Sequence, residues 1–469
     1  MEIGFTKSIR NFLIHVDGLP SIKINDMVQN EAGLRGWVRA LYDDRIEVLL
    51  LDEGDIREGQ KFRSIGKTLS VSAGSFLLGR AINPLGIPID GKGIFGRSKV
   101  EVSLHLDPTP AGINTREFIK DQFTTGIKII DTLVPIGKGQ RELILGDARS
   151  GKTSLLVDII INQKNADVIC IYAAIGKPVA EVRNLIDVLK ANQALSHTIV
   201  VASSSADSPP LIFLTPQTAM TLAEFFQKQG KDVLIILDDM GNHAKIYREI
   251  ALLSNRTPGR ESYPGDIFYQ QAHILERAGN FVKILGGGSI TALPVIEINL
   301  NDFTTYIPTN LMAMTDGHLL IRSSLFTRGQ RPAVDLSLSV SRVGQQTQNP
   351  LQNALSTKIK QVLSAGMQLE TVSRFSFELP SETQLILRQF DLLQHLLRQP
   401  PLTSYPLAHQ IILLGLPFTT FVQEKTAQDS EALLKTLLRK PAFVSLAANV
   451  LKIKTLDQLF AEVEKILLT

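Results

Sequence analysis

The segment GDARSGKT, at residues 146–153, carries the clearest chemical signal in the sequence. It has the spacing Gly, four residues, Gly-Lys-Ser/Thr, and it follows the apolar run RELIL and precedes the run SLLVDIIINQK. In a strand, loop and helix of this order, main-chain N–H groups converge on phosphate oxygens at the helix N-terminus. Lys152 can reach the β- and γ-phosphates, and the Thr153 hydroxyl can bind Mg²⁺. The pattern therefore predicts a site for Mg-ATP or Mg-ADP.

A nucleotide site of this kind also needs a carboxylate on the metal side. Asp238 follows an apolar run in DVLIILDDM, so we expect it at the carboxyl end of a buried strand, near the phosphates. The alternative role for Asp238 is an N-cap on the next helix, and Asp239 is the less favoured metal partner. The residues expected to bind the nucleotide are Gly146, Asp147, Arg149, Ser150, Gly151, Lys152, Thr153 and Ser154, with Thr153 and Asp238 on the metal.

Hydrolysis requires a side chain that orients the attacking water, and here the sequence offers a lysine. In AAIGKPVAEV, at residues 173–182, Lys177 follows the glycine at the end of the second core strand. A protonated lysine neither accepts a proton from water nor polarises it as a carboxylate does. We therefore predict a site that binds nucleotide without efficient turnover. Glu181 is the alternative base, although an acid three positions after Pro178 is more simply a partner of a helix dipole.

Composition limits the class of protein. The 469 residues include 44% hydrophobic and 20% charged residues, as expected for a soluble globular chain of about three domains. A net charge of +3 without a run of Lys or Arg argues against nucleic acid as a partner. The only cysteine, Cys170, lies in an apolar stretch and is expected to be a buried thiol rather than a reactive one. The first residues lack the pattern of an export signal, so we expect a reducing, cytosolic setting.

Patterning divides the chain into three predicted domains. Residues 1–90 contain short strands and predict a small β-barrel, and residues 91–355 predict an α/β domain with a mainly parallel sheet around the phosphate loop. Residues 356–469 carry leucines at helical spacing and predict a helical bundle. Residues 401–423 contain no charged side chain, but prolines, a histidine and glutamines interrupt them, so we expect buried helix packing rather than a membrane span.

Seven segments together resemble the alpha subunits of F-type (rotary) ATP synthases. They occur in the same order as in that family, over about residues 70–350, and are GKGQRELILGDARSGKT, LIILDD, RTPGRESYPGDIFY, GGGSITALPVIE, YIPTNLMAMTDG, LFTRGQRPAV and SVSRVG. The resemblance implies a RecA-like core with an N-terminal barrel and C-terminal helices. Paralogous beta subunits and export ATPases have a glutamate where this chain has Lys177, which favours the alpha subunit.

The resemblance also implies partners and residue roles. Beta-like catalytic subunits would alternate with this chain in a ring of three and three around a gamma-like central shaft, with peripheral-stalk subunits as further candidates. The ring would synthesise ATP, and this synthesis would be coupled to transmembrane ion flow. The complex would lie at the cytoplasmic face of a membrane, to which this chain would be attached only through other subunits. Arg342 would be an arginine finger donated to a neighbouring site, although a lone arginine is otherwise a surface residue. Phe326, Arg331 and, as a weaker match, Gln399 would flank the adenine, and residues 256–266 would face the shaft.

Three departures from the family pattern bear on these expectations. Lys177 stands where the family usually has glutamine, and Pro401 replaces a second glutamine of the adenine pocket, which puts base recognition in doubt. Few residues precede the predicted barrel, so we expect stalk attachment to be altered or absent. Two other functions stay open, namely a homohexameric ATPase for protein export or unwinding that uses Glu181 as its base, and a regulatory nucleotide sensor outside any synthase.

Overall fold

The computed structural model describes residues 2–95, 102–299, 302–373, 380–420 and 436–468. The chain forms two compact units. The first unit comprises Met1–Phe118, Lys138–Ala148 and Gln163–His318, and the second comprises Ile119–Gly137, Arg149–Asn162 and Leu319–Thr469. The phosphate loop therefore begins in the first unit and continues into the second. The three-domain division at residues 90 and 355 stays a prediction.

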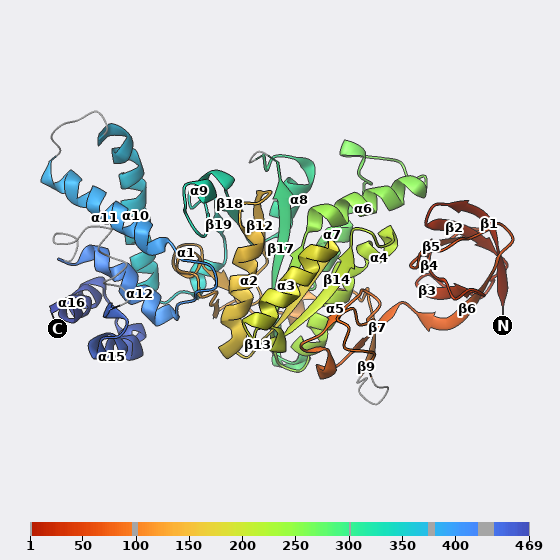
Figure 1. Ribbon diagram of the computed structural model, residues 1–469, viewed down its shortest axis with the longest axis horizontal. Coiled ribbons are helices and arrows are strands. Elements are labelled where there is room, and N and C mark those ends of the chain that lie inside the picture. Colours follow the sequence, from red (N-terminus) through yellow and green to blue (C-terminus); the bar gives the residue numbers. More distant parts are fainter. Residues whose placement is uncertain (1, 96–101, 300–301, 374–379, 421–435, 469) are drawn as a thin grey trace. The chain divides into compact units, whose positions relative to one another are not determined.

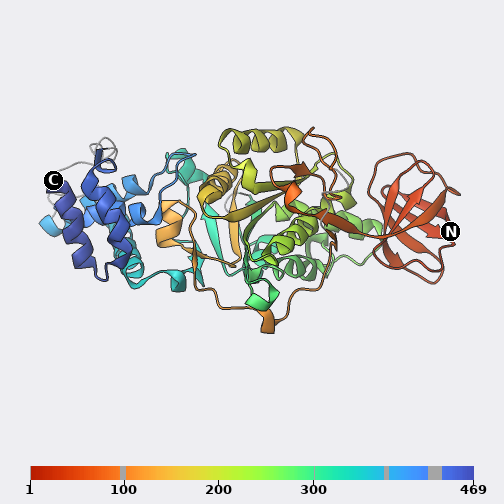
Figure 2. The ribbon, with the colours of Figure 1, turned by 90° about the horizontal axis from the view of Figure 1, so that it is seen from below.

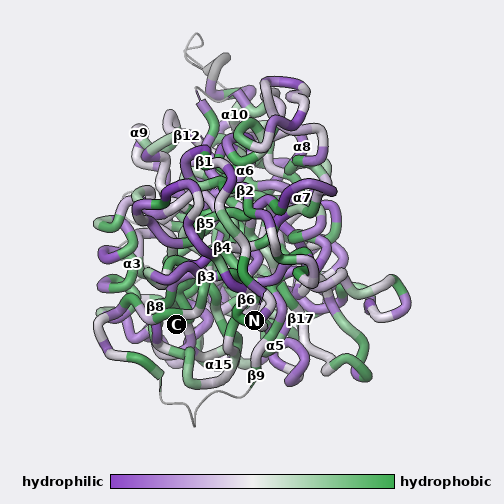
Figure 3. The backbone as a smooth tube through the Cα atoms, turned by 90° about the vertical axis from the view of Figure 1, so that its right-hand side faces the viewer, coloured by the Kyte–Doolittle hydropathy of each residue, from purple (hydrophilic) through white to green (hydrophobic). Residues whose placement is uncertain are grey.

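A closed β-barrel forms the N-terminal part of the first unit, as the sequence predicts (Figure 1). Its strands follow one another around the barrel in the order β1-β2-β5-β4-β3-β6. Buried and exposed residues alternate at the start of β1 and of β6, whereas every residue of β5 is buried. Hydrophobic and hydrophilic stretches are mixed along the barrel (Figure 3). A bend at Asp43 and Asp44 joins β4 to β5. The strands are β1 (Ile3–Arg10), β2 (Leu13–Asp17), β3 (Asp26–Asn30), β4 (Arg35–Leu41), β5 (Ile46–Leu50) and β6 (Lys61–Thr68).

The rest of the first unit is built on a parallel sheet. Its strands are hydrogen-bonded in the order β12-β17-β15-β13-β14-β8, and each of these neighbouring pairs is parallel. The strands are nearly continuous apolar runs because helices cover both faces of such a sheet. Cys170, on β13, is fully buried, as predicted. The strands are β8 (Ala81–Ile82), β12 (Glu142–Asp147), β13 (Val168–Lys177), β14 (Thr198–Ser204), β15 (Asp232–Asp238) and β17 (Ser289–Ile298).

Helices and short strands complete the first unit. Helix α5 packs on β13 and β15, and α3 packs on β14. The helices are α3 (Val179–Ala191), α4 (Pro209–Phe213), α5 (Thr215–Gln227), α6 (Met240–Leu253), α7 (Ile267–Leu275) and α8 (Tyr306–Met314). The short strands are β7 (Ser70–Ala73), which pairs with β9 (Val102–His105), and β16 (Gly279–Asn280), which pairs with β17.

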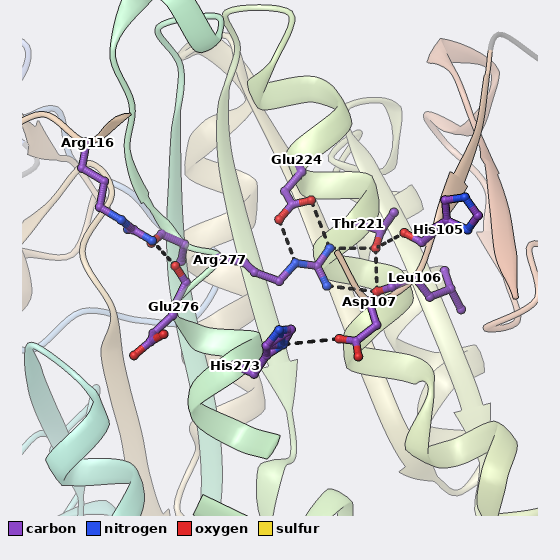
Figure 4. A network of polar contacts seen from close by, with 10 residues as sticks. His105, Leu106, Asp107, Arg116, Thr221, Glu224, His273, Glu276 and Arg277 are labelled. Atoms are coloured by element: carbon purple, nitrogen blue, oxygen red, sulfur yellow. Dashed lines mark hydrogen bonds and ion pairs between the residues drawn. The ribbon is translucent and has the colours of Figure 1, made fainter. Parts of the chain in front are cut away.

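A buried arginine ties three segments of this unit together (Figure 4). Arg277, just after α7, has a side chain that is 0% exposed. Its guanidinium donates to both carboxylate oxygens of Glu224 at 2.7 and 3.1 Å. It also donates to the Thr221 hydroxyl at 2.8 Å and to the Leu106 carbonyl at 3.1 Å. Because each of these bonds replaces one to water, the charge can be buried between α5, α7 and the end of β9.

The second unit holds the helices that follow the sheet in sequence, shown in blue in Figure 2. In α10, Gly366 lies against the ring of Phe390 from α11, and a side chain at position 366 would overlap that ring. The long helices are α10 (Pro350–Ser373), α11 (Ser381–Leu397), α12 (Leu407–Gly415), α15 (Pro441–Asn449) and α16 (Leu456–Leu468). The shorter elements are β10 (Gln122–Phe123), α1 (Lys128–Leu133), β11 (Ile136–Gly137), α2 (Lys152–Asn162), α9 (Ser323–Thr327) and β19 (Val340–Ser341), and β18 (Gly317–Ile321) begins in the first unit.

The part of the uncharged segment 401–423 that forms a helix is buried, as predicted. Its central residues lie in α12, and Ile411 through Leu414 are each 1% exposed or less. Residues 421–423 lie outside the described residues. Within the described parts of the chain, no helix combines the length and the apolar composition that crossing a bilayer demands. The fold is therefore a P-loop α/β core with an N-terminal barrel and C-terminal helices, as the sequence predicts.

Candidate nucleotide-binding site

The phosphate loop joins the end of β12 to the start of α2. Gly151 has φ +95°, a left-handed conformation that glycine adopts without steric cost. A Cβ at this position would lie 3.1 Å from the ring of Phe326, so the main chain approaches that ring closely. Lys152 and Thr153 open α2, and Thr153 is exposed. The first N–H groups of a helix have no partner within it, so the loop can present them to an anion.

A cavity of about 250 Å³ lies beside this loop in the second unit. It brings three predicted loop residues, Ser150, Gly151 and Ser154, together with the predicted adenine residues. Most of its other lining side chains are apolar, as expected for a site that holds a planar base. The lining residues are Ile127, Ser150, Gly151, Ser154, Leu155, Asp158, Ile321, Phe326, Arg331, Pro332, Ala333, Gln399 and Pro401.

Two of the predicted adenine residues, Phe326 and Arg331, contact each other at the cavity. The Arg331 guanidinium carbon lies 4.5 Å from the centroid of the Phe326 ring. This distance is short enough for a cation–π interaction, which holds the long arginine side chain against the ring. The pair gives the cavity one aromatic and one planar cationic surface, and both can stack on a base.

Gln399 lines the same cavity, but main-chain groups occupy its amide. Its Nε2 donates to the carbonyls of Gly126 at 2.9 Å and Thr403 at 2.7 Å. Its Oε1 accepts from the Lys128 N–H at 3.2 Å. An amide offers two N–H donors and one carbonyl oxygen, so Gln399 fixes the chain around the cavity more than it reads a base. Sequence reasoning could not foresee these partners, because all three are main-chain groups.

Asp158 is a cavity residue that the sequence prediction missed. It lies on α2, one turn after Ser154, so both residues share the helix face that lines the cavity. Its Oδ1 accepts from the Leu402 N–H at 2.8 Å. Burial raises the pKa of Asp158 to about 6, against the opposing effect of this hydrogen bond. The helical spacing from the loop was the signal that could have identified it.

Asp238, the predicted metal-side carboxylate, lies at the end of β15 in the first unit and is 4% exposed. β12, from which the loop starts, ends at the same edge of the sheet, with β17 between them. Lys177 Nζ lies 2.8 Å from Asp238 Oδ1, and the Tyr172 hydroxyl donates to Oδ2 at 2.6 Å. Both oxygens of Asp238 therefore have protein partners, and a cation already compensates the charge. Its predicted role beside Mg²⁺ stays a prediction.

The Lys177 ammonium is held in its charged form. Burial lowers the pKa of Lys177, but the charge of Asp238 and the hydrogen bond to it outweigh burial, so the pKa lies above its usual value. Burial and the same carboxylate raise the pKa of Tyr172 well above its ordinary range. Neither group can take a proton from water near neutral pH.

Two nearby acids lie at the starts of helices. Asp239, not Asp238, caps α6, because its Oδ1 accepts from the Asn242 N–H at 2.6 Å. The alternative role considered for Asp238, a helix cap, is therefore wrong by one residue. Pro178 is the N-cap of α3, and Glu181 is exposed in its first turn. This placement fits the helix-dipole role for Glu181.

Arg342 is exposed, on a main chain that is firmly anchored. The hydroxyl of Ser341 donates to the Pro135 carbonyl at 2.7 Å and accepts from the Gly344 N–H at 3.1 Å. Any side chain at position 344 would overlap the Pro135 carbonyl, so only glycine fits there. The anchored turn fixes where the Arg342 side chain starts.

The loop at residues 256–266 is a compact turn. The Gly259 N–H donates to the Tyr263 carbonyl at 2.7 Å, and Pro258 and Pro264 form an isolated antiparallel bridge. Pro258 is exposed and Pro264 is buried. The two prolines stiffen the turn, because each fixes its own φ angle. The predicted contact of this loop with a central shaft stays a prediction.

Comparison with known proteins identifies the family. Residues 126–341 match the ATP synthase alpha/beta family, nucleotide-binding domain. The ATP synthase subunit alpha of Metamycoplasma arthritidis is 39% identical over 416 residues, which cover 88% of this chain and 78% of that protein. The ATP synthase subunit alpha of Clostridium acetobutylicum is 40% identical over 425 residues, which cover 90% of this chain and 84% of that protein. With a nucleotide-binding fold and similarity of this extent, the chain belongs to the family of ATP synthase alpha subunits.

Proposed function

We propose that this chain binds Mg-ATP or Mg-ADP at a non-catalytic site, as the alpha-like subunit of a rotary ATP synthase. One observation carries the non-catalytic part. Lys177 occupies the position from which a hydrolytic relative would orient water, and it is paired with Asp238 at 2.8 Å. A charged ammonium in this place cannot act as a base.

The chain's own residues account for binding. The N–H groups at the start of α2 and the Lys152 ammonium hold the phosphates, and the exposed Thr153 hydroxyl supplies a ligand for Mg²⁺. When bound, the metal ion neutralises phosphate charge. The cavity beside Gly151 is large enough for a purine ring and mostly apolar, and the Phe326 and Arg331 side chains lie on its wall. These features fit the nucleotide.

Chemistry would take place at sites on neighbouring chains. Arg342 would extend into the site of an adjacent beta-like subunit and stabilise charge on the transferring phosphoryl group. Its exposure and the anchored turn around Ser341 and Gly344 support this role. The further partners we propose are a gamma-like shaft, which residues 256–266 would face, and peripheral-stalk subunits. The complex would be peripheral to a membrane, at its cytoplasmic face.

Binding and turnover by the purified chain test the first part of the proposal. We expect the chain to bind a fluorescent ATP analogue and to show negligible ATP hydrolysis. Lys152→Ala should abolish binding, whereas Lys190→Ala, on a helix surface, should leave it unchanged. Steady hydrolysis by the chain alone would refute the proposal and favour the homohexameric ATPase that uses Glu181.

The Arg342 role is tested in the assembled complex. Because a donated arginine is worth about 10³ to 10⁵ in rate, Arg342→Ala should lower ATP hydrolysis by at least about 10³. Nucleotide affinity of this chain should stay nearly the same. The exposed Arg328, which lies outside the anchored turn, provides the matched control variant Arg328→Ala. A complex with Arg342→Ala that keeps more than about a tenth of its activity would contradict this role.

A further inference from the structure

The cavity beside the phosphate loop is lined by one side chain that is a charged hydrogen-bond acceptor, alongside the hydroxyls of Ser150 and Ser154. Gln399 has its amide oxygen and both amide hydrogens bonded to main-chain groups. Arg331 carries donors only, and Pro401 offers no polar side-chain atom. Among the side chains that line the cavity, Asp158 is the one carboxylate. Asp158 therefore offers the cavity a charged hydrogen-bond acceptor.

The position of Asp158 is fixed from two directions. The rigid helix α2 places it one turn beyond Ser154, on the face that borders the cavity. The hydrogen bond from the Leu402 N–H to Oδ1, at 2.8 Å, then holds the carboxylate in one orientation. A carboxylate has about four lone-pair directions, so this bond leaves further acceptor capacity. Partial burial of the Asp158 carboxylate costs free energy, and a hydrogen bond donated by a ligand to its remaining acceptor positions offsets that cost.

We propose that Asp158 reads the base of the resident nucleotide, by accepting a hydrogen bond from the exocyclic amine at C6 of adenine. This inference rests on the proposed nucleotide binding and adds the residue that sets its specificity. Hypoxanthine and guanine carry a carbonyl oxygen at C6, and a carboxylate repels that oxygen. Phe326 and Arg331 would contribute stacking, which every purine can use. Selectivity would thus come from Asp158, in place of the glutamine that Pro401 replaces.

The test compares ATP with ITP, because these nucleotides share their phosphates and ribose and differ at C6. Competition against a fluorescent ATP analogue on the full chain gives both dissociation constants. A hydrogen bond to a charged acceptor increases binding affinity by roughly 10- to 100-fold. ATP should therefore bind at least about 10-fold more tightly than ITP. In Asp158→Asn, the remaining oxygen stays on the Leu402 N–H and the amide hydrogens face the base. The preference should then disappear or reverse in favour of ITP.

Two controls separate this role from a structural one. Asp457→Asn removes a carboxylate in the first turn of α16, which does not line the cavity, and should keep the wild-type ratio. Asp158→Asn should bind ITP no more weakly than wild type does, which a general loss of folding would not produce.

Equal affinities of wild type for ATP and ITP, or an unchanged ratio in Asp158→Asn, would overturn the inference and leave nucleotide binding in place. GTP bound as tightly as ATP would overturn the assignment to the C6 amine. A chain that binds none of the three nucleotides would overturn the proposed function and this inference with it.

Discussion

Replacing Lys177 by methionine should destabilise the first unit by about 3 kcal/mol. Coulomb's law for unit charges 2.8 Å apart, with an effective dielectric constant of about 20, gives an attraction of about 6 kcal/mol between Lys177 and Asp238. Desolvation of two ions offsets several kcal/mol of this, so the pair contributes little net stability. Removing one partner is different, because Asp238, which is 4% exposed, then lacks its cation and has the Tyr172 hydroxyl as a partner. Breaking buried pairs in this way costs about 3–5 kcal/mol, and the 20% exposure of the Lys177 side chain favours the lower end.

Urea unfolding of the purified chain, followed by circular dichroism, measures this loss as a drop in transition midpoint. The double variant Lys177→Met and Asp238→Asn removes both charges and should recover about 2 kcal/mol relative to Lys177→Met alone. Tyr172→Phe in each background shows how much of the remainder comes from the tyrosine hydroxyl. If Lys177→Met costs less than about 0.5 kcal/mol, or if the two substitutions simply add, the ion pair is not the buried, coupled unit described above.

Three further predictions concern stability. Burial lowers the pKa of His243 to about 3, so this histidine stays neutral in the folded chain. Its contribution to the free energy of unfolding is therefore fully present above about pH 6.5 and is lost as the pH falls toward 3. Unfolding free energy should drop by about 2 kcal/mol more between about pH 7 and pH 5 in wild type than in His243→Leu, and equal drops would exclude this source. Arg277→Met should cost about 3 kcal/mol in urea unfolding because it leaves Glu224, whose side chain is 15% exposed, without its cation. The double variant with Glu224→Leu should restore most of this loss. Gly344→Ala should lower thermal stability by at least about 2 kcal/mol, because its Cβ would overlap a main-chain carbonyl. Gly265→Ala, which has open space around its Cβ, is the control and should be neutral. Similar melting temperatures for the two variants would show that the main chain at position 344 moves to accommodate the Cβ.

Local patterns predicted the elements and the phosphate loop, because the information lies within a few consecutive residues. The apolar run before Asp238 correctly placed it at the end of β15, and the loop leads into a helix as predicted, although that helix begins at Lys152 and not at Ser154. The same patterns could not assign the helix cap to Asp239, because two adjacent acids at a strand end are equivalent until the backbone turns.

Contacts between distant positions escaped prediction for a different reason. Asp238 and Tyr172 lie 66 positions apart, and only the parallel pairing of β13 with β15 brings their side chains together. The amide of Gln399 was assigned to a base by its motif, yet it binds main-chain groups that the sequence does not distinguish. Asp158 was within reach of prediction, since helical spacing from the loop would have shown which face it shares.

The burial of Cys170 has a practical consequence for experiments on this chain. Alkylating and maleimide reagents react with the thiolate, and burial both shields this sulfur and raises its pKa. The natural sequence therefore serves as an unreactive background. A single cysteine introduced at an exposed position would accept a fluorophore or spin label at that position alone, so distances and rotations within an assembled complex could be followed without first removing any native residue.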